Sequence, residues 1–379
     1  MKRVFLLGGL RSHVGVRNGI FKNVLPEDLG AGLLREIGKQ FDLSQADGLY
    51  CGNAVGPGGN IGRLTLLKAG LSPSMPGITI DAQCASSLTA IDLAAGSIAA
   101  GRADFLIAGG VESSSLAPEK FYAVHDPRSS LRDRRYHAAQ FIPEEWCDEA
   151  MLLGAERTAE WAGISREEAD RAALESQRRA AKAAEEGLLS DVIVPLFGSV
   201  RDEAIRPRIT EKVMRRARCM SGRDGGIITA ANACTINDGA AFVLLCSDSF
   251  LRVHGLKAKA EIVETALTGG DLWRPPLAAD AAAGAAIQKA GLTYEDMTAF
   301  EYNEPFSVID VLFERAHPAV KERLNQWGGA LAYGHPYGAS GAIILIHLMK
   351  ILESHGGGYG VASIGAAGGV GESVILRSL

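Results

Sequence analysis

The sequence has no apolar stretch long enough to cross a membrane, and it has no strong excess of either charge. A membrane-spanning helix needs roughly 18–20 consecutive apolar residues, and no such run occurs in these 379 residues. The net charge is −5, from 39 basic and 44 acidic residues. So mild a balance argues against non-specific binding to DNA or RNA. We therefore predict neither a membrane nor a nucleic acid as a partner.

The sequence also lacks any closely spaced cysteine or histidine pair that would indicate a metal site. Its cysteines are scattered, at positions 51, 84, 147, 219, 234 and 246, and none forms a Cys-x-x-Cys pair. Two basic residues precede the first apolar stretch, but Arg11 interrupts it, which favours a first β-strand over a signal peptide. Scattered cysteines in such a chain are typical of free thiols in a reducing compartment. We predict a cytoplasmic protein without a metal.

A nucleotide-phosphate loop is absent as well. The glycine-rich segment Gly365–Gly371 lacks the Lys-Ser/Thr pair of a P-loop. No acidic residue can follow at the roughly 20-residue distance of a dinucleotide-binding fold, because the chain ends at Leu379. We therefore predict no nucleotide cofactor. Backbone N–H groups exposed by these glycines would instead suit an oxyanion hole.

What the sequence does contain is an alternation of strand-like and helix-like segments. In the first third, short apolar segments alternate with segments whose apolar residues recur at helical spacing. Such alternation predicts an α/β fold with a parallel sheet covered by helices. The predicted strands are Val4–Gly8, Gly48–Cys51, Gly77–Ile80 and Phe105–Gly110, and the predicted helices are Pro26–Phe41 and Leu88–Ile98.

The last third repeats the order of the first. Cys84-Ala-Ser is followed by a helix, a strand and Gly-Gly, and Gly338-Ala-Ser is followed by the same series, with a helix at Gly341–Leu352 and a strand at Tyr359–Ile364. The middle is richer in Arg and Glu and resembles an inserted lobe. We infer an internal duplication, with a site between two similar halves at the carboxyl ends of their strands.

Cys84 is the first candidate for chemistry. It lies where a predicted strand runs through small residues into a helix, in Ile80-Asp-Ala-Gln-Cys-Ala-Ser-Ser. The start of a helix lowers the pKa of a thiol and holds an anion, so Cys84 could be a nucleophile. Taken alone, such a segment more often holds an inert packing cysteine.

His335 and Asn303 are two further candidates. His335 lies in a stiff loop rich in glycine, and Pro336 keeps it out of the middle of a helix. Such a histidine can act as a base or donate a hydrogen bond to a thioester oxygen. Asn303 follows the apolar stretch Met297–Phe300, where an amide could orient a water or a carbonyl. A plain loop and a plain turn are the alternatives.

Together and in this order, these segments resemble the thiolases over nearly the whole chain. The Cys84 segment looks like the family's nucleophile motif, and Asn303-Glu-Pro-Phe is similar to its Asn-Glu-Ala-Phe motif. Gly334-His-Pro-Tyr-Gly-Ala-Ser-Gly matches its Gly-His-Pro motif. Further similar segments are Asn232-Ala-Cys-Thr-Ile-Asn-Asp-Gly-Ala-Ala, Ala108-Gly-Gly-Val-Glu-Ser and Gly163-Ile-Ser-Arg-Glu-Glu-Ala-Asp.

The resemblance implies a thiolase fold, in which two duplicated βαβαβαββ halves form a five-layered αβαβα core with an inserted loop domain. Residues 1–114 plus 238–257 would form the N-terminal half and 258–379 the C-terminal half. Residues 115–237 would form the loop domain, which serves coenzyme A binding and oligomerisation. A homodimer or a dimer of dimers is implied. The family's tetramer-forming part corresponds to Phe121–Trp146, which is too unlike the family to choose between the two.

The resemblance also implies a two-step acyl transfer. The Cys84 thiolate would take an acyl group from acyl-CoA with His335 as the base, and a second acyl-CoA would then be deprotonated and attack that group, or the reverse. Asn303 corresponds to the residue that holds a water in one oxyanion hole, and the N–H groups of Cys84 and Gly365 to the other. Coenzyme A would be a substrate rather than a cofactor, with contacts implied at Met151, Arg206 and Cys234.

The sequence departs from the family at the second catalytic cysteine of the Cys-x-Gly motif. The matching segment here is Ala362-Ser-Ile-Gly365, with Ser363 in place of the cysteine. A hydroxyl is a far weaker acid than a thiol, so condensation would slow by roughly 10²–10⁴. Ala150 and Pro305 replace a family histidine and alanine.

Three readings follow from this. The first is a CoA-dependent thiolase, of the acetyl-CoA acetyltransferase or 3-ketoacyl-CoA thiolase type. In it His335 or a water would act as the acid or base in place of the second cysteine. The second is a specialised condensing enzyme or acyltransferase that passes the acyl group from Cys84 to another acceptor. The third is a non-catalytic partner subunit, which the retained Cys84, His335 and Asn303 disfavour.

Overall fold

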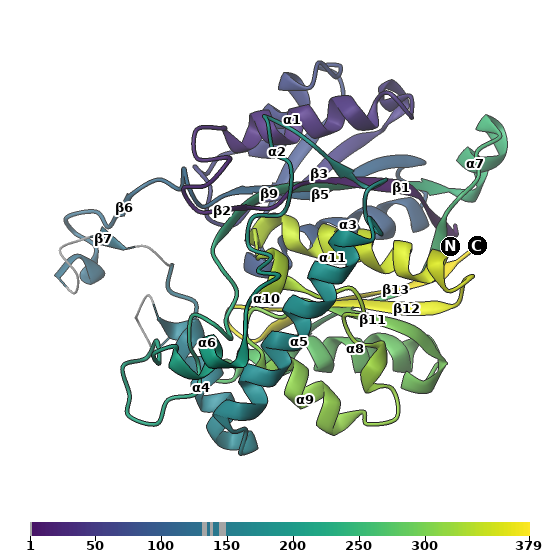
Figure 1. The fold of residues 1–379 in the computed structure, drawn as a ribbon. Helices are drawn as coiled ribbons and strands as arrows, with labels where there is room; N and C mark the ends of the chain where they lie inside the picture. Colours follow the sequence, from purple (N-terminus) through teal and green to yellow (C-terminus); the bar gives the residue numbers. More distant parts are fainter. Residues whose placement is uncertain (1, 131–134, 137–138, 144–148) are drawn as a thin grey trace.

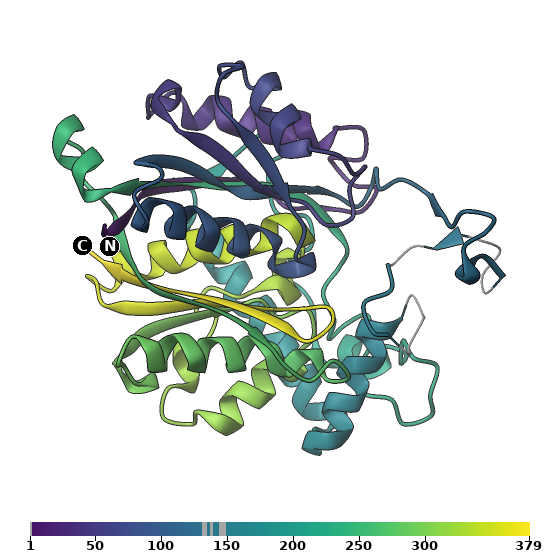
Figure 2. The same cartoon turned by 180° about the vertical axis from the view of Figure 1, so that it is seen from behind.

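The computed structural model describes residues 2–130, 135–136, 139–143 and 149–379. Helices and sheets alternate in five layers, with one helical layer between two sheet leaves and one on each outer face (Figure 1). The same layers are visible from behind in Figure 2. The predicted α/β architecture is confirmed.

The first leaf has the strand order β4-β3-β5-β9-β1. These strands are β1 (Val4–Ser12), β3 (Gly48–Gly52), β4 (Gly77–Ile80), β5 (Phe105–Ser113) and β9 (Asn237–Ser247), with the short β2 (Gly15–Val16) and β8 (Ile193–Val194) at the side. β3 is parallel to β4 and β5, but β9 is antiparallel to β5 and β1. Our expectation of a parallel sheet was therefore wrong for β9, because a fully buried strand has the same apolar pattern in either orientation.

The second leaf has the order β11-β12-β13-β10 and joins the first where β10 pairs with β1. Its strands are β10 (Ala260–Gly269), β11 (Met297–Tyr302), β12 (Tyr359–Ala366) and β13 (Val370–Ser378). The fifth strand of a duplicated half is reduced to one bridge between Leu324 and Phe300. Asn325 turns the chain there with φ 43°. Its side-chain amide then pairs with the N–H and C=O of Tyr302, at 2.9 and 3.0 Å.

The helices fall into three layers and a lobe. α3 (Ser86–Ala99) and α11 (Tyr337–Ser354) lie between the leaves (Figure 1). The outer layers are α1 (Pro26–Ile37) with α2 (Ile61–Lys68), and α8 (Ala278–Lys289) with α9 (Val308–Ala316). α7 (Asp248–His254) and α10 (Ala330–Tyr333) are short, as are the 3₁₀ turns η1 (Leu43–Gln45), η2 (Gln83–Ala85), η3 (Pro127–Ser130), η4 (Pro275–Leu277), η5 (Tyr294–Asp296) and η6 (Lys321–Arg323).

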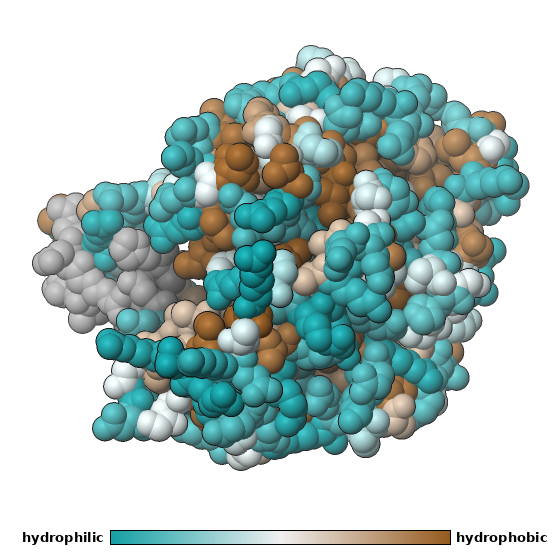
Figure 3. Space-filling model, viewed as in Figure 1, coloured by the Kyte–Doolittle hydropathy of each residue, from teal (hydrophilic) through white to brown (hydrophobic). Residues whose placement is uncertain are grey.

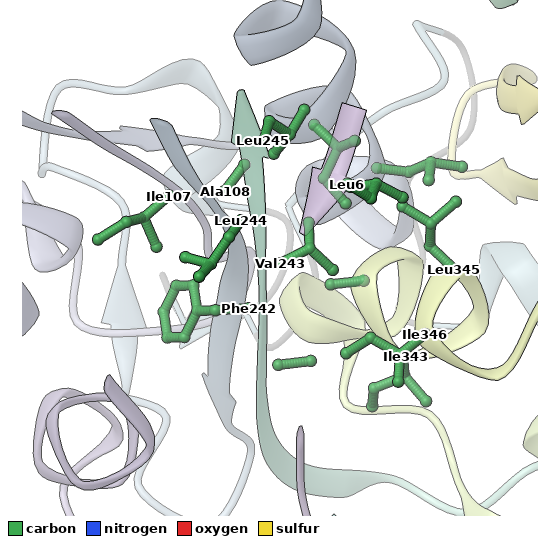
Figure 4. Packing of buried hydrophobic residues seen from close by; sticks show 14 of the residues in the cluster. Leu6, Ile107, Ala108, Phe242, Val243, Leu244, Leu245, Ile343, Leu345 and Ile346 are labelled. Carbon is green, nitrogen blue, oxygen red and sulfur yellow. The ribbon is translucent and has the colours of Figure 1, made fainter. Parts of the chain in front are cut away.

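The core explains why α11 is apolar on all sides. A helix buried between two sheets has no face for solvent, and nearly every residue of α11 is buried. β9 alternates its side chains, so that Val243 packs toward Ile346 of α11 while Phe242 packs toward α1 (Figure 4). Both central helices contact strands of both leaves, α3 on β5 and β13 and α11 on β5 and β12.

The middle of the chain forms a lobe beside these layers. It contains β6 (Lys120–Phe121), β7 (Arg135–Tyr136), α4 (Ala150–Ala162), α5 (Arg166–Glu185) and α6 (Glu211–Arg216). α5 begins at a capping box in which Ser165 and Glu168 bond to each other's backbone N–H groups. Cys147 and part of the expected tetramer-forming segment lie outside the described residues. Within the described part of the chain, no helix is long and apolar enough to span a membrane.

Candidate active site

Cys84 lies in a sharp connection between β4 and α3. After β4 ends at Ile80, the Asp81 carboxylate accepts a hydrogen bond from the N–H of Gln83 at 2.8 Å. Gln83 has a left-handed backbone with φ 54°, and the Ser86 hydroxyl accepts from the N–H of Ala82 at 3.0 Å. The turn η2 places Cys84 two residues before α3, as the sequence predicted for a helix start.

Glycines let the segments around Cys84 approach one another closely. A Cβ on Gly110 of β5 would overlap the carbonyl oxygen of Gly338 in the first turn of α11. A Cβ on Gly52 of β3 would lie 2.5 Å from the backbone N of Ser87 at the start of α3. Both contacts are closer than real Cβ atoms allow. The starts of α3 and α11 are therefore held against the same strand ends.

His335 is fixed in the loop between α10 and α11. Its N–H donates to Asn237 Oδ1 at 2.8 Å, and its Nδ1 lies 2.6 Å from Ser340 Oγ. Asn303 Nδ2 lies 3.4 Å from His335 Nε2 and can donate only to an unprotonated nitrogen. The ring hydrogen is then on Nδ1, donated to Ser340, and the single lone pair of Nε2 accepts the hydrogen bond from Asn303. This is the tautomer that a base needs.

Burial sets the protonation states of both groups. It raises the pKa of Cys84 to about 12, because the backbone N–H that lowers the pKa is outweighed by loss of hydration. It lowers the pKa of His335 to about 3. Our expectation that the helix start would give a net lowering of the Cys84 pKa was therefore wrong. The resting pair is a neutral thiol and a neutral imidazole, so acylation needs a proton transfer.

Asn303 joins the site through the backbone of the second leaf. It follows β11, and its N–H donates to the carbonyl oxygen of Ser363 at 2.9 Å. Its Oδ1 is buried and has no hydrogen-bond partner in the described structure. A buried amide oxygen without a partner is costly, so a water or a substrate group is expected there.

Cys234 and Tyr337 complete the surroundings of the thiol. The pKa of Cys234 is raised first by burial and then by the nearby Cys84. The pKa of Tyr337 is likewise raised, first by burial and then by Cys234 and Cys84. Its ring centroid lies 4.9 Å from that of His335. The backbone N–H of Cys234 donates to Pro305 at 2.9 Å. Cys84, Cys234, Asn303 and His335 are thus brought together.

Ser363 is placed differently from what its predicted role requires. Its Oγ donates to the carbonyl oxygen of Ala279 in α8 at 2.7 Å and lies 3.2 Å from that of Glu372. The hydroxyl thus faces the outer helical layer and is engaged by main-chain acceptors. Gly365, two residues on, has Pro275 and Ala279 beside its Cα. β12, which carries both residues, packs against η2.

Two of the predicted coenzyme A contacts lie farther out. Met151 is half-buried in the first turn of α4. Arg206 lines a separate groove between α5 and residues 189–209, and Cys84, His335 and Asn303 are not among the residues that line this groove.

Sequence reasoning missed Glu112. This buried carboxylate accepts from the N–H groups of Ala54 at 2.9 Å and Gly338 at 3.0 Å, and from the amide of Asn53 at 2.9 Å. It holds the start of α11 against the first leaf, and burial raises its pKa to about 7. The signal was present in Ala108-Gly-Gly-Val-Glu-Ser, where an acid ends an otherwise apolar strand.

Comparisons with known proteins agree with this geometry. The thiolase N-terminal domain model matches residues 4–249 and the thiolase C-terminal domain model residues 256–378. The chain is 36% identical to the putative acetyl-CoA C-acetyltransferase YhfS of Bacillus subtilis, over 97% of each chain. It is 34% identical to the corresponding protein VraB of Staphylococcus aureus, over 99% of each.

Solved structures are similar over the same extent. The acetyl-CoA acetyltransferase of Bacillus anthracis superposes with a TM-score of 0.92 at 29% identity, covering 100% of this chain and 99% of that one. Human mitochondrial 3-ketoacyl-CoA thiolase in complex with CoA gives 0.91 at 28% identity, covering 100% and 98%. Fold, site and relatives together define an acyltransferase. The chain belongs to the thiolase family.

Proposed function

We propose that this acyltransferase takes an acyl group from acyl-CoA onto Cys84 and makes or cleaves the carbon–carbon bond of a 3-ketoacyl-CoA. In the first step the Cys84 sulfur bonds to the thioester carbonyl carbon, and the bond from that carbon to the coenzyme A sulfur breaks. The Cys84 proton passes through His335 Nε2 to the leaving thiolate. The observation that supports the proposal is a neutral imidazole held by Ser340, with Nε2 unprotonated and only the long 3.4 Å contact from Asn303 Nδ2 on it.

The N–H groups of Cys84 and Gly365 and the water expected on Asn303 would stabilise negative charge on the thioester oxygens. Support for Asn303 comes from its buried and unpartnered Oδ1. Met151 and Cys234 are proposed to contact coenzyme A, as the resemblance implies. Arg206 is a weaker candidate because it lies in the groove beyond α5.

The second step needs another acid or base at the α-carbon. The Ser363 hydroxyl is bound to main-chain carbonyls, so we assign this work to His335, a water or the neighbouring Cys234. The alternative, transfer of the acyl group to a non-standard acceptor, is favoured by the same engagement of Ser363. A non-catalytic partner subunit is the least supported reading, because Cys84, Asn303 and His335 are all retained.

Intact-protein mass spectrometry after mixing with acetyl-CoA tests the first step, with Cys84→Ala as the control. Acetoacetyl-CoA plus coenzyme A tests the second, with Cys234→Ser as a further variant. Acetylation of the wild type, its loss in Cys84→Ala and cleavage of acetoacetyl-CoA are expected. Acetylation without any carbon–carbon chemistry would replace the main proposal by the alternative acceptor, and no acetylation would support the partner subunit.

We further propose that the chain acts as a homodimer or a dimer of dimers in the cytoplasm. β4 is an edge strand of the first leaf, and exposed apolar side chains lie on it and on the neighbouring helix α3, at Ile78 and Leu93. An edge strand with apolar neighbours favours pairing with a second copy. Light scattering of Ile78→Lys beside the wild type tests this, since a monomeric wild type would contradict it.

A further inference from the structure

A groove of about 1110 Å³ lies between α5 and residues 189–209. Its walls are mainly apolar, from Ala181 and Ala184 on α5 and from Ile193, Pro195 and Ile205 on the facing segment. Figure 3 shows the face with α5 at its front, where hydrophobic side chains are exposed among hydrophilic ones. The size is that of a pocket for a small organic molecule.

The floor of the groove is polar and buried. Arg11 is fully buried and forms two hydrogen bonds with Asp202, at 2.9 and 2.7 Å. His13 is 8% exposed, and its Nδ1 lies 3.0 Å from Ser199 Oγ. Tyr333 is 3% exposed and lines the groove, yet its hydroxyl has no hydrogen-bond partner in the described structure. An unpartnered buried hydroxyl costs stability, so a polar group is expected beside it.

Positive charge gathers at the rim. Arg201 and Arg206 line the groove, and neither forms an ion pair within the described part of the chain. Arg178 and Lys182 also line it, although Arg178 faces Glu175 of α5 and Lys182 faces Glu186 at the end of that helix. Of the acidic side chains that line the groove, Asp202 is neutralised by Arg11, which leaves Glu185. The excess of guanidinium groups favours an anion.

The groove is separate from the thiol site, since none of Cys84, Asn303 and His335 lines it. Tyr333 nevertheless precedes His335 by two residues, so the floor of the groove is continuous with the loop that carries the imidazole. We propose that this groove is a second binding site, for an amphipathic anion with a carboxylate or phosphate head and an apolar body. The head lies at Arg201 and Arg206, and the body lies along the alanine face of α5.

Calorimetric titration with octanoate and with octyl phosphate tests the site, on Cys84→Ala protein saturated with coenzyme A. These conditions exclude covalent capture and occupy the thiol site. 1-Octanol has the same apolar body without charge. Both anions are expected to bind more tightly than 1-octanol, and the tighter one identifies the head group that the rim prefers.

Three variants locate the binding. Arg201→Gln is expected to weaken anion binding roughly three- to tenfold, since the guanidinium is exposed and screened. Ala181→Trp fills the groove and is expected to weaken it more than tenfold. Arg171→Gln, an exposed arginine of α5 outside the groove, is the matched control and should leave binding unchanged. Made in the wild-type background, Arg201→Gln and Ala181→Trp should keep the melting temperature and the acetylation of Cys84.

Three results would overturn the proposal: equal binding of octanol and the anions, loss of anion binding when coenzyme A is added, or equal binding by Arg201→Gln and the wild type. Because acetylation of Cys84 is measured separately, failure here leaves the proposed function standing.

Discussion

Gly110→Ala should disrupt the active site by pushing the start of α11 away from β5, although Gly110 contacts no reacting group. The new Cβ would lie 2.8 Å from the Gly52 carbonyl oxygen and would overlap the carbonyl oxygen of Gly338. Backbone lies on both sides, so no flexible side chain can yield. Relief therefore requires α11 to move away from β5 by about 1 Å or more. Overpacking of this kind costs about 3 kcal/mol.

The expected loss can be measured in two ways. For 379 residues the unfolding entropy is roughly 0.8 kcal/mol/K, so about 3 kcal/mol lowers the melting temperature by roughly 4 °C. Because His335 lies two residues before α11, a 1 Å displacement should also slow acetylation of Cys84 by about 10²-fold. Differential scanning calorimetry and time-resolved mass spectrometry provide the two readings.

The matched control is Gly32→Ala in α1, another buried glycine. A Cβ there meets Phe197 and Leu196 at 3.5 and 3.6 Å, which is ordinary contact. Alanine in a helix should stabilise by about 0.5–1 kcal/mol, with acetylation unchanged. If Gly110→Ala melts and acetylates like the wild type, the close approach of β5 and α11 does not hold the site as argued.

Two further predictions concern buried groups of the second leaf. Burial, with a further contribution from Asp92, raises the pKa of Glu372 from 4.5 to about 8. Between these pH values the folded protein keeps a proton that the unfolded chain releases. The free energy of unfolding therefore falls as pH rises from about 4.5 to 8. Glu372→Gln removes that proton equilibrium, and its melting temperature should rise relative to the wild type between pH 5 and pH 8; parallel pH profiles would contradict this. Ser363→Ala loses the bond to Ala279 and should cost about 1 kcal/mol in chemical denaturation, with carbon–carbon bond cleavage within twofold of the wild type. A hundredfold loss of cleavage would instead show that the hydroxyl takes part in proton transfer.

Strong periodicity made part of the fold predictable. The strand Gly77–Ile80 has the predicted bounds, and the predicted helix Leu88–Ile98 lies within α3. The fold class and the family are confirmed. Strand direction was not predictable, because β9 is buried throughout and its apolar centre has the same pattern whichever way its neighbours run. The loss of the fifth strand of the second leaf was also not predictable. There the Asn325 side-chain amide takes the place of backbone pairing with Tyr302.

The residues of the candidate site could be predicted from the sequence, but their pKa values and side-chain directions could not. Cys84, Asn303 and His335 come from three distant motifs, and the resemblance to the thiolases is what indicated that they meet. The pKa of the thiol depends on how much water surrounds it, and that is set by packing from both leaves. The direction of the Ser363 side chain depends on the pleat of β12. Matching one residue to a family motif does not show which way that side chain points. The predicted domain limits and the residue roles remain predictions.

The duplication itself explains why the two reacting groups meet. Cys84 precedes α3 and His335 precedes α11, and these are equivalent helices of the two halves, lying side by side between the leaves. Neither half alone contains both groups. Glu112 of the first half binds the N–H of Gly338 in the second, and Gly110 allows the close approach. The tight packing that brings the thiol to the imidazole also removes water from both, so proximity and the opposed pKa shifts have one cause. A substitution that loosens this contact should therefore change the distance and the proton balance together.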